Sequence, residues 1–192
     1  MTSAVSRTLC TAPDCSEMTS RDSGEAPFGV LMHRQLKLIH QMLRSDLTVC
    51  RELAGVVAAG APAADIAAQI LALQTRSPIW TLQVNCLYHC RVVHAHHGHE
   101  DADMFPALRR SNPELSAVVN KLEADHRAIS SLLDDVEESA KGLDDAAVNA
   151  AVNPARLRLV TALGRLEEDL LAHLAYEEES IASTMRSWEQ WP

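Results

Sequence analysis

The sequence predicts an all-α protein, and its length, apolar composition and residue spacing each favour this fold class. The chain has 192 residues, which suits one domain, and 47% of them are hydrophobic, which is enough to bury a core. Aromatic residues make up only 4%, and Ala and Leu, which favour helices, dominate the apolar set. Four long stretches with helical apolar spacing predict an up-down-up-down four-helix bundle, with a short extra helix between the first two long helices.

Each of the four long helices is predicted to begin at a proline. Proline fits the first helical turn, where its missing N–H group is not needed. Ser77, Asn112 and Asn153 precede three of these prolines and are good N-cap residues. The predicted long helices span residues 27–58, 78–110, 113–141 and 154–186.

The remaining segments are predicted from their composition. Residues 59–76 are Ala-rich with a small apolar face, which predicts the short extra helix. Residues 1–26 are polar and lack the apolar centre of a signal peptide, so we expect a disordered N-terminal tail. The bundle itself is predicted to cover residues 27–187, followed by a C-terminal tail at 188–192.

Charge and cysteine content exclude several classes of function. A formal net charge of −9 argues against a nucleic-acid-binding surface and against a basic membrane-binding face. No apolar run reaches the roughly 18 to 20 residues that a membrane-spanning helix needs. The five cysteines are an odd number without a paired framework, which fits a reducing cytoplasm as the location.

Histidines occupy core positions on the predicted helices. His126 lies on a stripe of residues 113–141 whose other members are Leu, Val and Ile. His40 lies on the stripe of the first helix, and His173 and Glu177 continue the stripe of the last. Imidazoles and a carboxylate at core positions are costly unless they pair with one another or hold a metal ion.

The depths of four histidines along their helices agree with one another. His40 and His126 each lie 13 residues after the proline that begins their helix, whereas His96 and His173 lie 18 and 19 residues after theirs. At about 1.5 Å per residue, these depths meet at one level when neighbouring helices of about 30 residues run in opposite directions. One histidine from each helix is therefore predicted to reach a common layer.

Two carboxylates accompany this layer, because Glu100 lies one turn after His96 and Glu177 one turn after His173. Four imidazoles and two carboxylates exceed the needs of one tetrahedral zinc ion. They suit two carboxylate-bridged ions, with iron or manganese as the natural choice and the two glutamates as candidate bridges. The predicted metal ligands are His40, His96, Glu100, His126, His173 and Glu177.

The pattern leaves two alternatives open. His33 lies on the same stripe as His40 and could replace it, although its depth differs by about 10 Å. His97 and Asp101 repeat the spacing of the preferred pair on their helix, so they could replace that pair or orient it. Because adjacent helical residues point in different directions, only one of the neighbouring histidines 96 and 97 is expected to point fully inward.

Other residues of these helices receive structural interpretations. Cys86 and Cys90 lie one turn apart and are expected to be small core residues rather than a redox pair. His89 is expected in a second layer or at the surface, and Tyr176, beside a predicted ligand, is expected to pack.

The chain resembles the hemerythrin-like (HHE cation-binding) domains, four-helix bundles that hold a non-haem di-iron centre. The matching pieces, in order, are HQMLRSDL, HHGHEDADMFPAL, LEADHRAI and HLAYEEES, and the resemblance covers roughly residues 28–187. The family spacing of His, His-x-x-x-Glu, His and His-x-x-x-Glu corresponds to the six predicted ligands. The resemblance implies two carboxylate-bridged iron ions per chain, in preference to manganese or zinc.

Two features of the chain depart from the oxygen-carrying members of that family. Those proteins have a second histidine one turn after the first on the third helix, and a longer His-to-Asp spacing on the fourth. This chain has Ser130 at the first position and keeps His-x-x-x-Glu at the second. The missing imidazole disfavours reversible oxygen carriage and leaves an open position, which favours binding or reduction of a small oxidant.

The resemblance implies a protein that binds, senses or reduces O2, NO or peroxide, or that handles iron. Whether it only binds or senses, or also turns over in a weak peroxidase- or catalase-like reaction, stays open, as does any protein partner. A ferritin-like enzyme needs two Glu-x-x-His motifs, and this chain offers only Glu123 to His126. The alternative is a metal-free helical-bundle interaction module, whose polar core residues would hydrogen-bond to one another.

Overall fold

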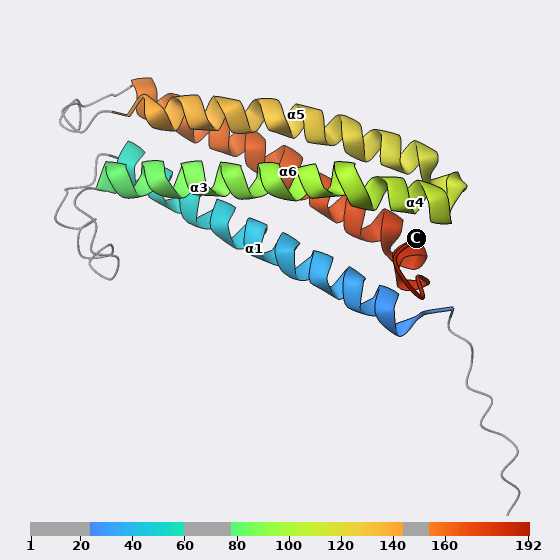
Figure 1. The fold of residues 1–192 in the computed structure, drawn as a ribbon. Coiled ribbons are helices and arrows are strands. Elements are labelled where there is room, and N and C mark those ends of the chain that lie inside the picture. The colour runs from blue at the N-terminus through green and yellow to red at the C-terminus, as the bar shows by residue number, and fades with distance from the viewer. Residues whose placement is uncertain (1–23, 60–77, 144–153) are drawn as a thin grey trace, which may run out of the picture.

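The computed structural model describes residues 24–59, 78–143 and 154–192, and all regular structure within these ranges is helical. The long helices are α1 (Pro27–Ala58), α3 (Pro78–His99), α5 (Ser116–Lys141) and α6 (Pro154–Arg186) (Figure 1). Shorter helices are η2 (Glu100–Met104), α4 (Phe105–Ser111) and η3 (Pro113–Leu115). Helices α3 and α6 each pack against both α1 and α5, so the four long helices surround one interior, and the predicted all-helical bundle is confirmed.

The bounds of the first and last long helices agree with the prediction. The predicted N-cap at Asn112 is also present, since its side chain accepts a hydrogen bond from the N–H of Glu114 (3.2 Å). The short extra helix expected within 59–76 falls almost wholly outside the described residues, as does most of the N-terminal tail expected at 1–26.

The second predicted helix is not a regular α-helix throughout. Pro106 lies inside it, and a proline there lacks an N–H donor and clashes with the carbonyl four residues earlier, that of Ala102. The chain widens directly before this proline into the π-helix η2, and Phe105 donates its N–H to the carbonyl of Glu100. The expectation of an uninterrupted α-helix over 78–110 was therefore wrong, and Pro106 is the signal that it missed.

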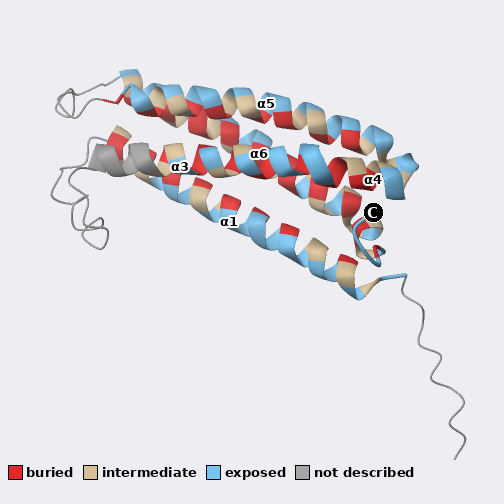
Figure 2. Cartoon of the chain, viewed as in Figure 1, coloured by how far each residue is buried: buried red, intermediate tan, exposed pale blue. Residues whose placement is uncertain are grey.

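Two apolar clusters fill the interior, where the buried faces of the helices meet (Figure 2). The large cluster includes Leu43, Leu47, Cys50, Cys86, Cys90, Leu133, Leu163 and Leu170. The small cluster includes Leu36, Met104, Phe105, Leu108, Leu122, Ile181, Met185 and Trp188. On α1 the buried face passes from Leu36 through His40 to Leu43, so a polar layer separates the two clusters. Both predicted core cysteines are fully buried.

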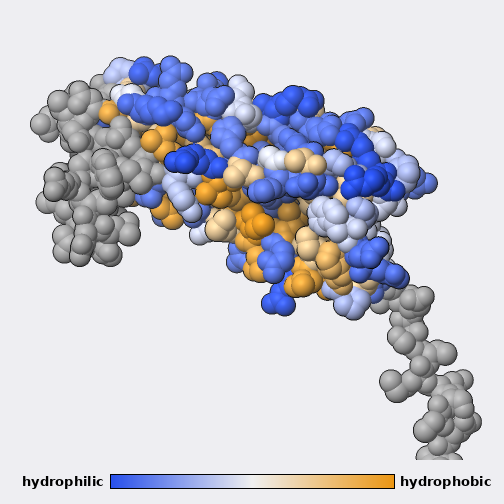
Figure 3. Space-filling view, viewed as in Figure 1, coloured by the Kyte–Doolittle hydropathy of each residue, from blue (hydrophilic) through white to orange (hydrophobic). Residues whose placement is uncertain are grey.

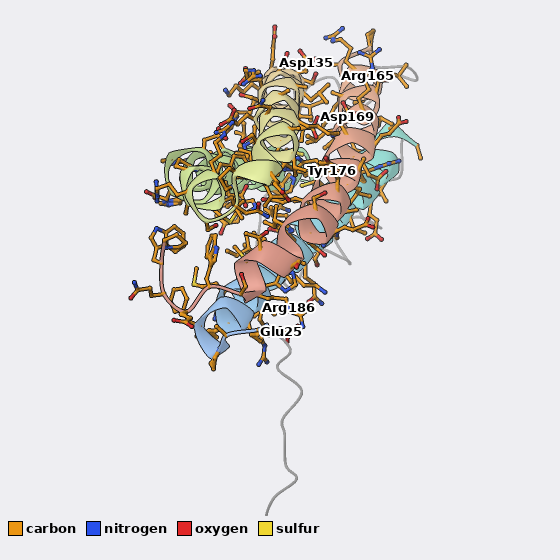
Figure 4. All side chains as sticks on the ribbon, turned by 90° about the vertical axis from the view of Figure 1, so that its right-hand side faces the viewer. Glu25, Asp135, Arg165, Asp169, Tyr176 and Arg186 are labelled. Atoms are coloured by element: carbon orange, nitrogen blue, oxygen red, sulfur yellow. The ribbon has the colours of Figure 1, made fainter. Side chains whose placement is uncertain are left out.

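The start of α1 lies against the end of α6. Glu25 forms an ion pair with Arg186, and both labels lie close together in Figure 4. A Cβ atom on Gly29 would lie 2.2 Å from the carbonyl oxygen of Met185, so only glycine permits this approach. Trp188, which begins the predicted C-terminal tail, is instead buried in the small cluster. The contact closes this end of the bundle.

The surface is polar over α5 and more apolar over α1 (Figure 3). The exposed large hydrophobic residues of α1 are Val30, Leu31, Leu38, Ile39, Met42 and Val49. Among the residues that the structure describes, no helix combines the length and apolar character that a membrane span requires.

Candidate metal centre

Four histidines, one from each long helix, meet in the polar layer. His40, His96, His126 and His173 are all buried. The Nε2 atoms of His40 and His96 lie 3.1 Å apart, and those of His126 and His173 lie 3.2 Å apart. The layer thus contains two facing pairs of imidazole nitrogens, at the level that the helix depths predict.

The carboxylate of Glu100 lies between the two pairs. Its Oε1 is 3.2 Å from Nε2 of His96 and 3.9 Å from Nε2 of His40, whereas its Oε2 is 3.4 Å from Nε2 of His126. Each oxygen therefore faces a different pair of histidines. This is the arrangement that a carboxylate bridging two ions requires.

Glu177 also contacts both pairs and is fully buried. Its Oε2 lies 3.4 Å from Nε2 of His40 and 3.7 Å from Nε2 of His173. Two groups of side chains have ligand atoms close enough together to hold a metal ion. These groups are His40, His96, Glu100 and Glu177, and His97, Glu100, His126 and His173.

His97 joins the second group although the sequence predicted that only one of two neighbouring histidines would point fully inward. Both are buried, with His96 8% and His97 5% exposed. Helix α3 packs between α1 and α5, so adjacent positions can face different neighbours. His96 faces His40 of α1, and the ring of His97 stacks on that of His126 of α5, with centroids 3.9 Å apart.

Carboxylates on the outer side orient two of the histidines. The Nδ1–H of His126 donates to Oδ1 of Asp101 (2.8 Å), and the Nδ1–H of His40 donates to Oε1 of Glu178 (2.9 Å). Arg44 holds the same Glu178 oxygen at 2.8 Å. A proton fixed on Nδ1 leaves the Nε2 lone pair pointing into the layer, where a ligand nitrogen must be. Asp101 is thus an orienting residue rather than a member of either group.

Other candidates from the sequence lie outside the two groups. His33 is partly buried and belongs to neither group. Glu123, the acid of the ferritin-like motif, forms a two-pronged ion pair with Arg109, with N–O distances of 2.6 and 3.0 Å. The ring of Tyr176, which is labelled in Figure 4, packs against the small cluster. The Lys121 ammonium lies 4.3 Å from its centroid.

Burial keeps most of the imidazoles neutral. Desolvation, together with the neighbouring histidines, lowers the pKa of His96 to about 3 and that of His126 to about 3. Burial also lowers the pKa of His40, but Glu100 and Glu177 beside its ring outweigh this effect and raise it to about 9. Burial and the nearby Glu177 raise the pKa of Glu100 to about 8. The layer therefore offers uncharged imidazole donors together with protons that a cation would displace.

The donor set fits a pair of cations. All four carboxylate oxygens of Glu100 and Glu177, and Nε2 of His97, are buried without a hydrogen-bond partner. Buried polar atoms of this kind are costly unless something else satisfies them. Two donors about 2.1 Å from one ion, at angles of about 90 to 110°, lie about 3.0 to 3.4 Å apart. The Nε2 separations of 3.1 and 3.2 Å fall in this interval.

The fold and the site define a class of protein, a helical bundle with two groups of buried histidine and glutamate that can each hold a metal ion. A comparison with protein-family models matches residues 31–184 to the hemerythrin HHE cation-binding domain. The chain belongs to this family, and the domain type implies metal binding. Neither the comparison with curated proteins nor the comparison with solved structures found a significant match.

Proposed function

We propose that this protein is a non-haem di-iron protein that binds, senses or reduces a small oxidant, such as O2, NO or peroxide, or that handles iron. The observation that carries this proposal is the position of Glu100, whose two oxygens face different pairs of histidines. The proposed ligands are His40, His96, Glu100, His126, His173 and Glu177.

The path of the chain supports this ligand set. The proposal includes an up-down-up-down order of the long helices, because only opposite directions bring the four histidine depths to one level. The contact of Glu25 with Arg186, which joins the start of α1 to the end of α6, supports this order. The course of the colours along the ribbons in Figure 1 also supports it.

The side chains of the layer are suited to hold iron and to shield it. When bound, an iron pair supplies electron exchange with small oxidants. Once a cation displaces the protons of His40 and Glu100, the carboxylates of Glu100 and Glu177 would bring negative charge to a site that is otherwise built from neutral imidazoles. Asp101 and Glu178 hold two of these imidazoles in the binding orientation. The apolar clusters on both sides limit access of bulk water to the layer.

The same observations weigh against a metal-free interaction module. Such a module predicts that the polar core residues satisfy one another by hydrogen bonds. Instead, the oxygens of Glu100 and Glu177 have no hydrogen-bond partner and are buried. A cation would satisfy these oxygens, whereas a partner protein bound at the surface would not reach them.

Metal analysis combined with optical spectroscopy tests the proposal. We expect about two iron ions per chain in the purified protein, and spectra that change on exposure to air, peroxide or NO. The double variant His126→Ala/His173→Ala should contain almost no metal. The matched control His94→Ala/His99→Ala removes two imidazoles outside the layer and should keep its iron. A well-folded native protein that binds no metal when iron is supplied would overturn the proposal.

A further inference from the structure

His97 is not one of the six proposed ligands, yet three of its properties suit a metal ligand. Its ring is buried, its Nε2 has no hydrogen-bond partner, and its ligating atom lies within 4.8 Å of those of Glu100, His126 and His173. Most buried polar atoms have a hydrogen-bond partner, so an unpaired buried nitrogen calls for an explanation. His89 of the same helix also has unpaired ring nitrogens, but it belongs to neither ligand group. In His97 the unpaired nitrogen belongs to a residue that is grouped with the proposed ligands.

We propose that His97 is a seventh iron ligand, which supplies from α3 a third imidazole to the ion held by His126 and His173. This inference rests on the proposed function. Helix α5 carries Ser130 one turn after His126 and so offers no second imidazole of its own. The ring of His97 lies over that of His126, and its centroid is 5.2 Å from that of His173. The third imidazole therefore comes from the neighbouring helix.

The assignment gives each ion its own imidazoles. His40 and His96 face the first ion, with Glu100 and Glu177 beside them, and His97, His126 and His173 face the second, with Glu100 between the two. The two ions are then chemically different, with two imidazoles on one and three on the other. Such a difference is measurable without any assay of activity.

The chain geometry around His97 supports this assignment. His96 and His97 lie four and three residues before Glu100, where the π-helix η2 begins. Single π-helical turns within α-helices are frequent at functional sites. The turn that begins at the proposed bridging glutamate is therefore next to both histidines that would bind the two ions.

The competing interpretation is that His97 only stacks on His126. The variant His97→Phe separates the two roles, because phenylalanine keeps an aromatic ring but has no donor nitrogen. We expect His97→Phe to lose iron to a chelator at concentrations at least about tenfold lower than the wild type does. Its Mössbauer spectrum should also lose the wild-type difference between the two iron sites. His99→Phe, which places the same ring at an exposed position of α3, is the matched control and should behave as the wild type.

A second variant keeps the test decisive if phenylalanine disturbs folding. His97→Gly leaves space for free imidazole, and added imidazole should restore the iron affinity and the spectrum. Unchanged chelator resistance and an unchanged spectrum in His97→Phe would overturn the inference. Weak binding in His97→Gly that imidazole does not improve would do the same. A wild-type protein without iron would defeat the proposed function itself, and the two failures are therefore distinguishable.

Discussion

The polar layer and the large apolar cluster occupy the same face of the same helices, yet burial has opposite consequences in the two regions. On α1, His40 and Leu43 are both 0% exposed. Removing Leu43 from water stabilises the fold, by about 1.5 to 3 kcal/mol for a side chain of this size. Removing histidines and carboxylates from water destabilises it unless a cation or a hydrogen bond compensates. The helical pattern thus determines which side chains are buried. The type of the buried residue determines whether its position stabilises the fold or can bind a cation.

The largest effects are expected from two substitutions on α5, one in the large apolar cluster and one in the polar layer. Leu133→Ala, in the large cluster, should lower the free energy of unfolding by about 2 to 5 kcal/mol with or without iron, because it opens a cavity in a fully buried region. His126→Leu should leave the metal-free protein about as stable as the wild type, because it removes a buried polar group. Denaturant unfolding of the metal-free and iron-loaded forms measures both effects.

The discriminating quantity is the stabilisation on iron loading. A ligand present at about 100 times its dissociation constant stabilises the folded state by about 2.7 kcal/mol. Leu133→Ala should keep this increment, whereas His126→Leu should lose most of it. If His126→Leu lowered the stability of the metal-free protein as much as Leu133→Ala does, the distinction between the two regions would be wrong.

A substitution of Asp101 tests how much the carboxylates outside the polar layer contribute to its metal affinity. Asp101→Asn removes the charge that orients His126 through its Nδ1–H while keeping the size of the side chain. Loss of such a partner typically weakens metal affinity about 10- to 100-fold, and we expect a loss in this range. Iron competition against a chelator measures it. Asp103→Asn, at an exposed position of the same π-helix, should have no effect, and equal losses in both variants would point to general electrostatics instead.

The sequence was sufficient to predict the helices and the layer because both depend on local rules. Proline starts and apolar spacing predicted α1 and α6 with their observed bounds. Counting residues from the prolines predicted that His40 and His173, far apart in the chain, share a level. These predictions needed only the rise per residue and the directions of the helices.

The sequence was not sufficient where a position depends on packing between helices. Whether His97 points inward depends on how α3 lies between α1 and α5, which no single-helix pattern encodes. Trp188 is buried because the end of α6 meets the start of α1, a contact between the two ends of the bundle. The π-helix η2 differs from these two cases, because Pro106 is visible in the sequence and indicates an interruption of the α-helix there.

His89 is buried outside the polar layer. It lies on α3, as His96 and His97 do, so histidines inside and outside the layer can be compared within one helix. Both ring nitrogens of His89 lack a hydrogen-bond partner, and burial lowers its pKa to about 4. The unfolded chain protonates this residue near pH 6.5, so between about pH 6.5 and 4 the unfolded state binds more protons. Its contribution therefore lowers the stability of the protein as the pH falls through that interval.

The substitution His89→Leu removes this contribution. Between pH 7 and pH 5, we expect the unfolding free energy of the metal-free variant to fall by about 1 to 2 kcal/mol less than that of the wild type. Denaturant unfolding at both pH values measures the difference. His99→Leu, at an exposed position, provides the control, and an unchanged pH dependence in His89→Leu would show that His89 does not stay neutral in the folded protein.

The smallest effect is expected at Glu123, a carboxylate close to the layer in sequence but outside it in space. Its partner Arg109 lowers the pKa of Glu123, and both side chains are about one-third exposed. Ion pairs at such positions contribute about 0 to 1 kcal/mol, so Glu123→Gln should change the unfolding free energy by less than that. Its iron content should equal that of the wild type, because neither group of ligands includes this residue. Loss of iron in Glu123→Gln would favour the Glu-x-x-His arrangement of ferritin-like enzymes, whereas retention confines the metal chemistry to the histidines and glutamates that face the layer.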